Sequence, residues 1–138
     1  MRARAAGAPV VHVQHVSAQG TRFEPGGAGR RIHARVAPRA GEAIIEKRKP
    51  DGFQGSTLEG VLRELGRTDL VLCGFATEAC FDSTVRSTHA RGFTLELAAD
   101  GHSTTANPVL DAKSIIAHHN FVLSRFAKVK PGAEIAFA

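Results

Sequence analysis

The sequence predicts an α/β fold, a three-layer α/β/α arrangement around a mostly parallel, doubly wound (Rossmann-like) sheet. Strand-like apolar segments alternate with amphipathic helical segments along the 138 residues, which is the pattern of repeated β-α-β units. Residues 69–75 (DLVLCGF) form the most apolar segment, and such continuous runs are typical of strands buried on both faces. We expect residues 1–138 to form a single domain.

The order of the elements follows from apolar periodicity and from the Gly and Pro residues that end segments. Residues 1–8 have the character of a helix end, with Gly7 as the stop signal and Pro9 just beyond it. Residues 17–42 are rich in Gly, Pro and Arg, and a loop of this length is usually functional or disordered. The expected strands cover 10–16, 43–46, 69–75, 93–99 and 126–130, and the expected helices cover 58–65 (capped by Ser56 or Thr57), 79–90 and 108–125.

The charge distribution, the strand pattern of the basic segment and the low aromatic content together argue against a nucleic-acid partner. Residues 1–39 contain seven Arg and one Glu, whereas residues 40–138 contain eleven basic and twelve acidic residues. An Arg-rich, acid-poor leader is found in transit peptides and nucleic-acid-binding arms. Here the same stretch contains PVVHVQHV, in which Val alternates with polar residues as in a strand. Because the sequence also has no Trp or Tyr for base stacking, we expect an ordered part of the fold with a basic surface.

Cysteine content and hydropathy predict a cytoplasmic protein. The spacing of Cys73 and Cys80 matches neither a CxxC redox or zinc pair nor a disulfide framework. No apolar run approaches the about 20 residues that a membrane span requires. The N-terminus lacks the long apolar core of a secretory signal. We therefore expect no membrane association.

Cys80 lies where the expected strand 69–75 is followed by a helix. Ligands bind beyond the carboxyl ends of strands in open parallel sheets, and N–H groups at a helix start favour a thiolate and can receive an oxyanion. Cys73 lies inside the strand, where we expect a buried and inert thiol. Position alone leaves two roles open for Cys80, a nucleophile and a small core residue.

Lys47 is the candidate partner of this cysteine. It follows the short strand 43–46 and so falls at a carboxyl edge as well. An ammonium group there can stabilise both a thiolate and the charge that develops in a transition state. Arg48 and Lys49 follow immediately, and spacing does not choose among the three, each of which is also explained as a solvated surface charge.

A longer stretch carries a family resemblance. Residues 46–104, EKRKPDGFQGSTLEGVLRELGRTDLVLCGFATEACFDSTVRSTHARGFTLELAADGHST, resemble the central part of the isochorismatase-like cysteine hydrolases. In that family a Lys begins a segment that leads to a Phe, as Lys47 leads to Phe53. A motif of the form Gly-aliphatic-Ala/Ser-Thr-acid-x-Cys then follows a strand, and residues 74–80 read GFATEAC. The resemblance continues through SIIAHHNFVLSRFAKV and covers nearly all of residues 9–138.

The resemblance implies a Cys/Lys/Asp triad on a doubly wound sheet, with Cys80 as the nucleophile and Lys47 as the triad lysine. It also implies a cis peptide bond between Phe75 and Ala76, with the Ala76 N–H directed at the same oxyanion as that of Cys80. The substrate would be a small molecule with an amide or enol-ether bond. Family members commonly form dimers or larger assemblies, so a homo-oligomer is expected.

The triad aspartate has no match in this sequence. In the family it lies on an opening strand of the form apolar-apolar-Asp-x-Gln in the middle of the sheet, so the resemblance describes a domain that lacks this first strand and most of the first helix. The aspartates present are Asp51, Asp69, Asp82, Asp100 and Asp111. Truncation, an aspartate strand supplied by another chain, and a degenerate member all remain open. We expect the 138-residue chain to turn over poorly on its own.

The remaining motifs indicate neither a metal nor a cofactor. His118 and His119 are neighbours on an expected helix, so their side chains point about 100° apart and cannot both face one ion. The Asp-Trp-His-Pro signature of the metal-containing nicotinamidases in the family is absent, as is the GxSxG of serine hydrolases. His12 and His15 could contact a substrate or simply occupy polar strand positions. We predict a cysteine hydrolase; the alternative is a non-catalytic member that serves as an interaction or oligomerisation module.

Overall fold

The computed structural model describes residues 2–137 and confirms the α/β class, with every strand pair parallel. The chain divides into two compact units. Unit 1 comprises residues 2–65 with Phe137, and unit 2 comprises residues 66–136. The strands form two sheets, β1-β2 in unit 1 and β3-β4-β5 in unit 2. The expectation of a single domain stays a prediction.

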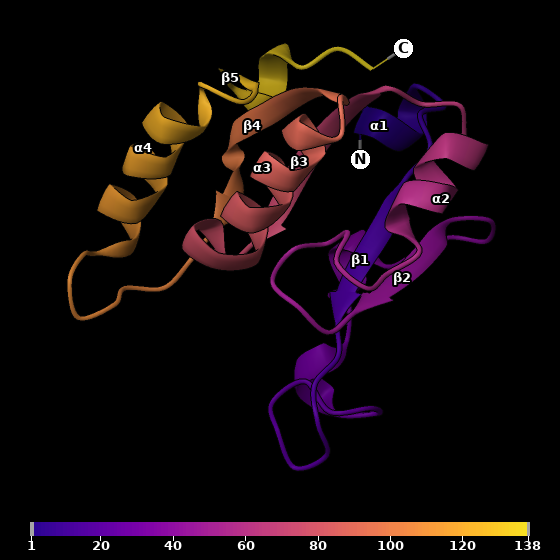
Figure 1. Cartoon of the computed structure of the whole chain (residues 1–138), viewed down its shortest axis with the longest axis vertical. Helices are drawn as coiled ribbons and strands as arrows, with labels where there is room; N and C mark the ends of the chain where they lie inside the picture. The colour runs from indigo at the N-terminus through magenta and orange to yellow at the C-terminus, as the bar shows by residue number, and fades with distance from the viewer. Residues whose placement is uncertain (1, 138) are drawn as a thin grey trace. The chain divides into compact units, whose positions relative to one another are not determined.

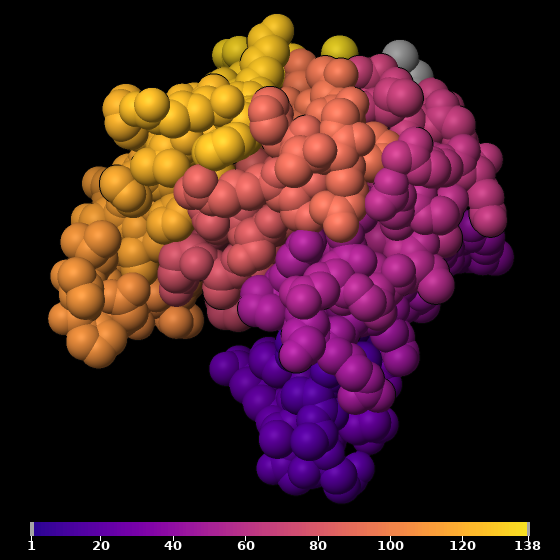
Figure 2. All heavy atoms as spheres, in the orientation of Figure 1, coloured from indigo at the N-terminus to yellow at the C-terminus, as the bar shows by residue number. Residues whose placement is uncertain are grey.

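Unit 1 is built on two parallel strands, β1 (Val11–His15) and β2 (Ala43–Lys47), flanked in sequence by α1 (Arg2–Ala5) and α2 (Leu58–Glu64). In the strand register His12 lies opposite Ile44, and His15 lies opposite Lys47. Between the strands the chain leaves the carboxyl end of β1 as a long segment (Figure 1) with two short 3-10 turns, η1 (Ala28–Arg30) and η2 (Ala34–Val36). The first part of this segment, in indigo at the bottom of Figure 2, forms a projecting lobe of unit 1.

Helix α2 begins and ends as its sequence predicts. The Ser56 hydroxyl accepts a hydrogen bond from the Leu58 N–H at 3.2 Å, so Ser56 supplies the side-chain contact that either Ser56 or Thr57 was expected to make. Leu58 and Leu62, four residues apart on one face, are buried. The helix stops before Gly66, which has a φ of +62°.

Unit 2 has three parallel strands in the order β3 (Asp69–Phe75), β4 (Thr94–Ser103) and β5 (Lys128–Lys130). A π-helical turn, η3 (Thr77–Phe81), leads into α3 (Asp82–Ala90), and α4 (Ala112–Leu123) connects β4 to β5. A last 3-10 turn, η4 (Gly132–Glu134), follows β5. These elements lie where they were expected, but some bounds differ. Strand β4 continues past residue 99 to Ser103, the helix after β3 begins with a π-helical turn, α4 begins at Ala112 rather than at 108, and β5 begins at Lys128 rather than at 126.

The core of unit 2 lies between its sheet and two helices. Helices α3 and α4 both contact β4 and each other (Figure 1). The buried cluster contains Phe81, Val85, Leu95, Leu97 and Leu123, with Leu70, Leu72, Phe126, Ala127 and Val129 packed around it. The two helices therefore cover one face of the three-stranded sheet.

Within unit 2, the helices cover only one face of strand β3. Cys73 is exposed, so the predicted burial of its thiol is wrong. Side chains alternate along a strand, and those that face the helices are Leu70 and Leu72. On the opposite face Phe75 is 54% exposed and Cys73 is exposed too. Protein atoms around the Cys73 thiol still raise its pKa through desolvation, which disfavours the thiolate.

None of the helices within residues 2–137 is long and apolar enough to cross a bilayer.

Candidate active site

Cys80 lies in the π-helical turn η3, directly after β3. The peptide bond between Phe75 and Ala76 is cis. The Ala76 carbonyl accepts hydrogen bonds from the N–H groups of Ala79 and Phe81, both at 3.1 Å. These bonds close the turn around Cys80, which is half-buried. Phe75, Ala76 and Cys80 are thus held together in unit 2, at the carboxyl end of β3.

A buried histidine that sequence reasoning did not select lies beside this turn. His102 is 5% exposed, and its Nδ1 lies 2.9 Å from the hydroxyl of Thr77, which is fully buried. Its Nε2 lies 3.0 Å from Oδ1 of Asn120 on α4. The imidazole also stacks on Phe81, with ring centroids 4.5 Å apart. The DGHST sequence was the available signal, but nothing in it connects His102 to Thr77.

Strand register explains how His102 reaches the turn. The β3–β4 pairing shifts after Leu72, so that His102 lies opposite Gly74, two residues before Ala76. Gly101 permits this local geometry, because a Cβ at that position would lie 2.5 Å from the Cβ of Ala98. The end of β4 therefore runs alongside the end of β3, where the candidate nucleophile follows.

Two further contacts tie down acidic residues of this region. The Thr104 hydroxyl donates to Oε2 of Glu78 at 2.6 Å, which links the turn to the segment after β4. Asp100 accepts a hydrogen bond from the Gly132 N–H at 2.7 Å. This hydrogen bond links Asp100 on β4 to the start of η4. Asp100 therefore has a structural contact, and it was not predicted to belong to the triad.

Lys47 is the last residue of β2 in unit 1 rather than the residue after the strand. It is 5% exposed, whereas Arg48 and Lys49 are exposed. Its ammonium group donates to the Lys49 carbonyl at 2.8 Å and lies 3.2 Å from Nδ1 of His15. Burial therefore distinguishes Lys47 from its basic neighbours, which spacing alone did not do.

His15 acts as the neutral partner of this lysine. Burial, and then the positive charge of Lys47, lower the pKa of His15 below its ordinary value. A neutral imidazole with its proton on Nε2 accepts the Lys47 hydrogen bond at Nδ1. The ring also makes an edge contact with Phe23, with centroids 5.6 Å apart. The sequence marked His15 only as a strand histidine, because its contact with Lys47 depends on the β1–β2 register.

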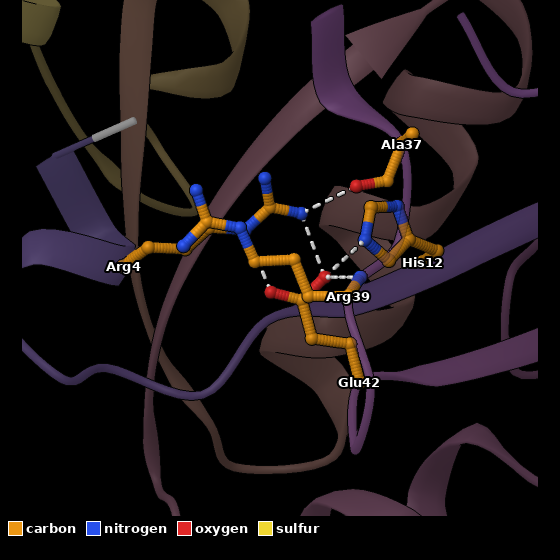
Figure 3. A network of polar contacts seen from close by, with 5 residues as sticks. All are labelled: Arg4, His12, Ala37, Arg39 and Glu42. Atoms are coloured by element: carbon orange, nitrogen blue, oxygen red, sulfur yellow. Dashed lines mark hydrogen bonds and ion pairs between the residues drawn. The ribbon is translucent and has the colours of Figure 1, made fainter. Parts of the chain in front are cut away.

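A second polar network of unit 1 lies toward the other end of β1 and β2 (Figure 3). The guanidinium group of Arg4 donates to both carboxylate oxygens of Glu42 at 2.7 Å. The same carboxylate contacts Nε2 of His12 at 3.1 Å and accepts from the Arg39 N–H at 2.9 Å. The hydrogen bond from Arg4 is the main reason that the pKa of Glu42 falls to about 2. A cavity of about 350 Å³ borders this network, and Val10, Val61 and Leu65 are among its apolar lining.

Residues 2–137 contain no group of three or more His, Cys, Asp or Glu side chains arranged to hold a metal ion. The rings of His118 and His119 are 5.6 Å apart and nearly perpendicular, and the Nδ1 of His119 donates to the Ile115 carbonyl at 2.8 Å.

Comparison with known proteins identifies the family. The family model for the isochorismatase domain matches residues 1–128. The chain belongs to the isochorismatase family. A crystal structure of an isochorismatase from Pseudomonas putida KT2440 superposes with a TM-score of 0.91 at 34% sequence identity, covering 98% of this chain and 72% of that one.

Two curated relatives of this isochorismatase-family chain are longer than it. An uncharacterized isochorismatase family protein of Bacillus subtilis (strain 168) is 37% identical over 118 residues, which are 84% of this chain and 65% of the relative. A streptothricin hydrolase of Streptomyces noursei is 38% identical over 103 residues, which are 75% of this chain and 41% of the relative. The family resemblance seen in residues 46–104 is thereby confirmed, and the chain is placed in a family of hydrolases.

Proposed function

We propose that the chain is a cysteine hydrolase that acts on a small amide or enol-ether substrate. In this proposal Cys80 is the nucleophile and Lys47 is its cationic partner. The observation that carries the proposal is the position of Cys80 in a helical turn at the carboxyl end of β3, the edge where open parallel sheets bind ligands. Similarity to a streptothricin hydrolase supports the hydrolase class.

For an amide substrate, the proposed chemistry is acyl transfer to sulfur. The Cys80 thiolate attacks the carbonyl carbon, a C–S bond forms, and the carbonyl electron pair moves to oxygen. The resemblance implies that the Ala76 N–H stabilises this oxyanion. Collapse of the intermediate breaks the C–N bond, and the amine leaves with a proton taken from solvent water. A water molecule then attacks the thioester carbonyl, the C–S bond breaks, and the carboxylic acid and the free thiol are released.

Lys47 suits the supporting role because of its surroundings in unit 1. Its side chain is buried, its ammonium group donates to the Lys49 carbonyl, and it lies beside the His15 imidazole. These contacts hold the ammonium group in one place at the end of β2, and a positive charge beside a thiol favours the thiolate. Removing the charge should therefore reduce the reactivity of Cys80.

Proton transfer is the step for which this sequence offers no matched residue. The resemblance assigns that role to an aspartate on a strand that has no match in this sequence, and Asp100, which lies within β4, accepts a hydrogen bond from the Gly132 N–H instead. General acid–base assistance is worth typically about 10²–10⁴-fold. We therefore propose that the 138-residue chain forms an acyl-enzyme faster than it hydrolyses it.

Iodoacetamide labelling tests the proposed nucleophile, because alkylation requires the thiolate. A Glu-specific protease cleaves after Glu78 and so separates Cys73 from Cys80 into different peptides. Near about pH 7, where an ordinary thiol is mostly protonated, we expect Cys80 to react faster than Cys73. Mass spectrometry of the two peptides measures both rates in one sample.

Substitutions at the lysines complete the test. If Lys47 is the cationic partner of Cys80, Lys47→Ala should slow alkylation of Cys80 by about tenfold, since a positive charge within a few ångströms of a thiol favours the thiolate by at least this factor. Lys47→Arg retains the charge and should slow it less, and Lys49→Ala, at an exposed lysine two residues away, should leave the rate unchanged. Reaction of Cys80 at the rate of an ordinary thiol, indifferent to Lys47, would favour a non-catalytic interaction module.

A further inference from the structure

His102 makes two side-chain hydrogen bonds and one aromatic stack with other elements of unit 2. The imidazole links three elements of unit 2: it belongs to β4, contacts Asn120 on α4, and contacts Thr77 in the turn that carries Cys80. It also stacks on Phe81, the residue directly after Cys80. His102 therefore touches the turn on both sides of the candidate nucleophile.

The hydrogen bonds fix the direction of this chain of contacts. The amide nitrogen of Asn120 donates to the Ala99 carbonyl at 3.0 Å, so Oδ1 is the Asn120 atom that faces His102. The imidazole must then carry its proton on Nε2 and present a lone pair at Nδ1. The Thr77 hydroxyl consequently donates to Nδ1. In this series of hydrogen bonds from Asn120 through His102 to Thr77, each of the named atoms acts either as a donor or as an acceptor and has a partner.

Burying a series of hydrogen-bonded polar side chains has a free-energy cost, which suggests that this network fixes the position of the elements it joins. Thr77 is fully buried and His102 nearly so, and apolar residues of similar shape at both positions would fill the space without needing partners. A satisfied buried network instead specifies one arrangement of the elements that it joins. Here the element with a preferred arrangement is the turn η3, whose first residue is Thr77 and whose fourth is Cys80.

We propose that His102 is a positioning residue for Cys80 and acts through the Thr77 hydroxyl. Asn120 orients the imidazole, the imidazole orients Thr77, and the stack on Phe81 limits movement of the turn on its other side. The consequence is that the turn holds Cys80 in one position directly after the carboxyl end of β3. This inference rests on the proposed nucleophilic role of Cys80.

The test compares two substitutions at Thr77. Thr77→Val keeps the shape of the side chain and removes the hydroxyl, whereas Thr77→Ser keeps the hydroxyl and removes a methyl group. We expect Thr77→Val to slow iodoacetamide alkylation of Cys80 near neutral pH by about five- to tenfold, the effect of one lost orienting hydrogen bond. Thr77→Ser should stay within about twofold of the unsubstituted protein.

A control substitution distinguishes a specific effect on the position of Cys80 from an overall loss of stability. Ile115→Val removes one methyl group from a buried side chain on α4, and it should lower the melting temperature of the protein without changing the alkylation rate of Cys80. If Ile115→Val slows alkylation as much as Thr77→Val does, or if Thr77→Ser is as slow as Thr77→Val, the hydroxyl does not position Cys80 and the proposal is wrong.

A measurement on the unsubstituted chain covers the case in which Thr77→Val does not fold. Nitrogen-15 NMR of the imidazole distinguishes its two neutral forms, and we expect His102 to carry its proton on Nε2 at neutral pH. A proton on Nδ1 would overturn the proposed direction of the chain. Failure of the proposed function has a different signature: Cys80 would then react like an ordinary thiol in the unsubstituted protein, before any change at Thr77.

Discussion

At the scale of single residues, the sequence offered candidates for the nucleophile and its cationic partner but did not indicate the histidines that lie beside each of them. Cys80 and Lys47 could be selected, as predictions, because each lies at or after the carboxyl end of a strand and the family motif matches both. His15 and His102 could not, because their roles depend on register: His15 lies opposite Lys47, and His102 lies opposite Gly74 after a shift in pairing. Neither pairing leaves a signal in the local sequence.

The contact between His15 and Lys47 predicts an acid-shifted titration. Burial and the Lys47 charge both favour the neutral imidazole, so the NMR titration midpoint of His15 should lie below the ordinary value of about 6.5. Lys47→Met removes the positive charge and should move the midpoint upward. An unchanged midpoint in Lys47→Met would show that the lysine charge does not act on His15.

At the scale of elements, helix and strand positions followed the predicted pattern closely, whereas the covered faces did not. The sequence DLVLCGF is apolar throughout, but an apolar run does not state how many faces will find a partner. In the structure α3 and α4 both pack on the face that carries Leu70 and Leu72. Phe75 and Cys73 are exposed because they lie on the opposite face of β3, which neither helix covers.

Glu42 should make the stability of unit 1 sensitive to acid. Its carboxylate joins α1, β1 and the start of β2 through Arg4 and His12 (Figure 3). Because its pKa falls from 4.5 to about 2 in the folded chain, the folded state binds fewer protons than the unfolded state. The stabilisation is therefore complete above the unfolded-state pKa of Glu42 and is lost as the pH falls toward the folded-state pKa.

Circular dichroism melting curves measured across this pH range test that expectation. Glu42→Gln should lower the melting temperature at neutral pH and should flatten its decline in acid. Glu59→Gln is the matched control, since Glu59 pairs with Arg63 on the exposed surface of α2 and such pairs contribute little. Equal effects of the two substitutions would contradict the assigned role of Glu42.

Helix α4 offers a pair of positions that tests its packing face. Leu123 is fully buried in the core of unit 2, whereas Phe121 is 69% exposed two residues earlier. We expect Leu123→Ala to lower the free energy of unfolding by about 2–5 kcal/mol, and Phe121→Ala to change it by about 0.5 kcal/mol or less. Urea unfolding measures both values, and a larger loss from Phe121→Ala would mean that the exposed side chain is covered by a partner.

At the scale of the whole molecule, the alternation of strands and helices was enough to predict the α/β class. The division into two units with separate sheets was not predicted, because local apolar patterns do not state which strands pair. The homo-oligomer and the cytoplasmic location stay predictions. The chain covers 72% of the similar Pseudomonas putida structure and 65% of the Bacillus subtilis relative, so the activity of the whole protein is a proposal.

The most direct test is acylation of the chain by p-nitrophenyl acetate. Release of nitrophenolate measures the rate of acylation, and the mass of the Cys80 peptide shows where the acetyl group is attached. We predict a stoichiometric burst, slow turnover after it, and one acetyl group on Cys80. Cys80→Ala should abolish the burst, and Lys47→Ala should slow it by about tenfold. A burst that survives in Cys80→Ala, or a wild-type chain that stays unacylated at Cys80, would contradict the assignment of Cys80 as the nucleophile.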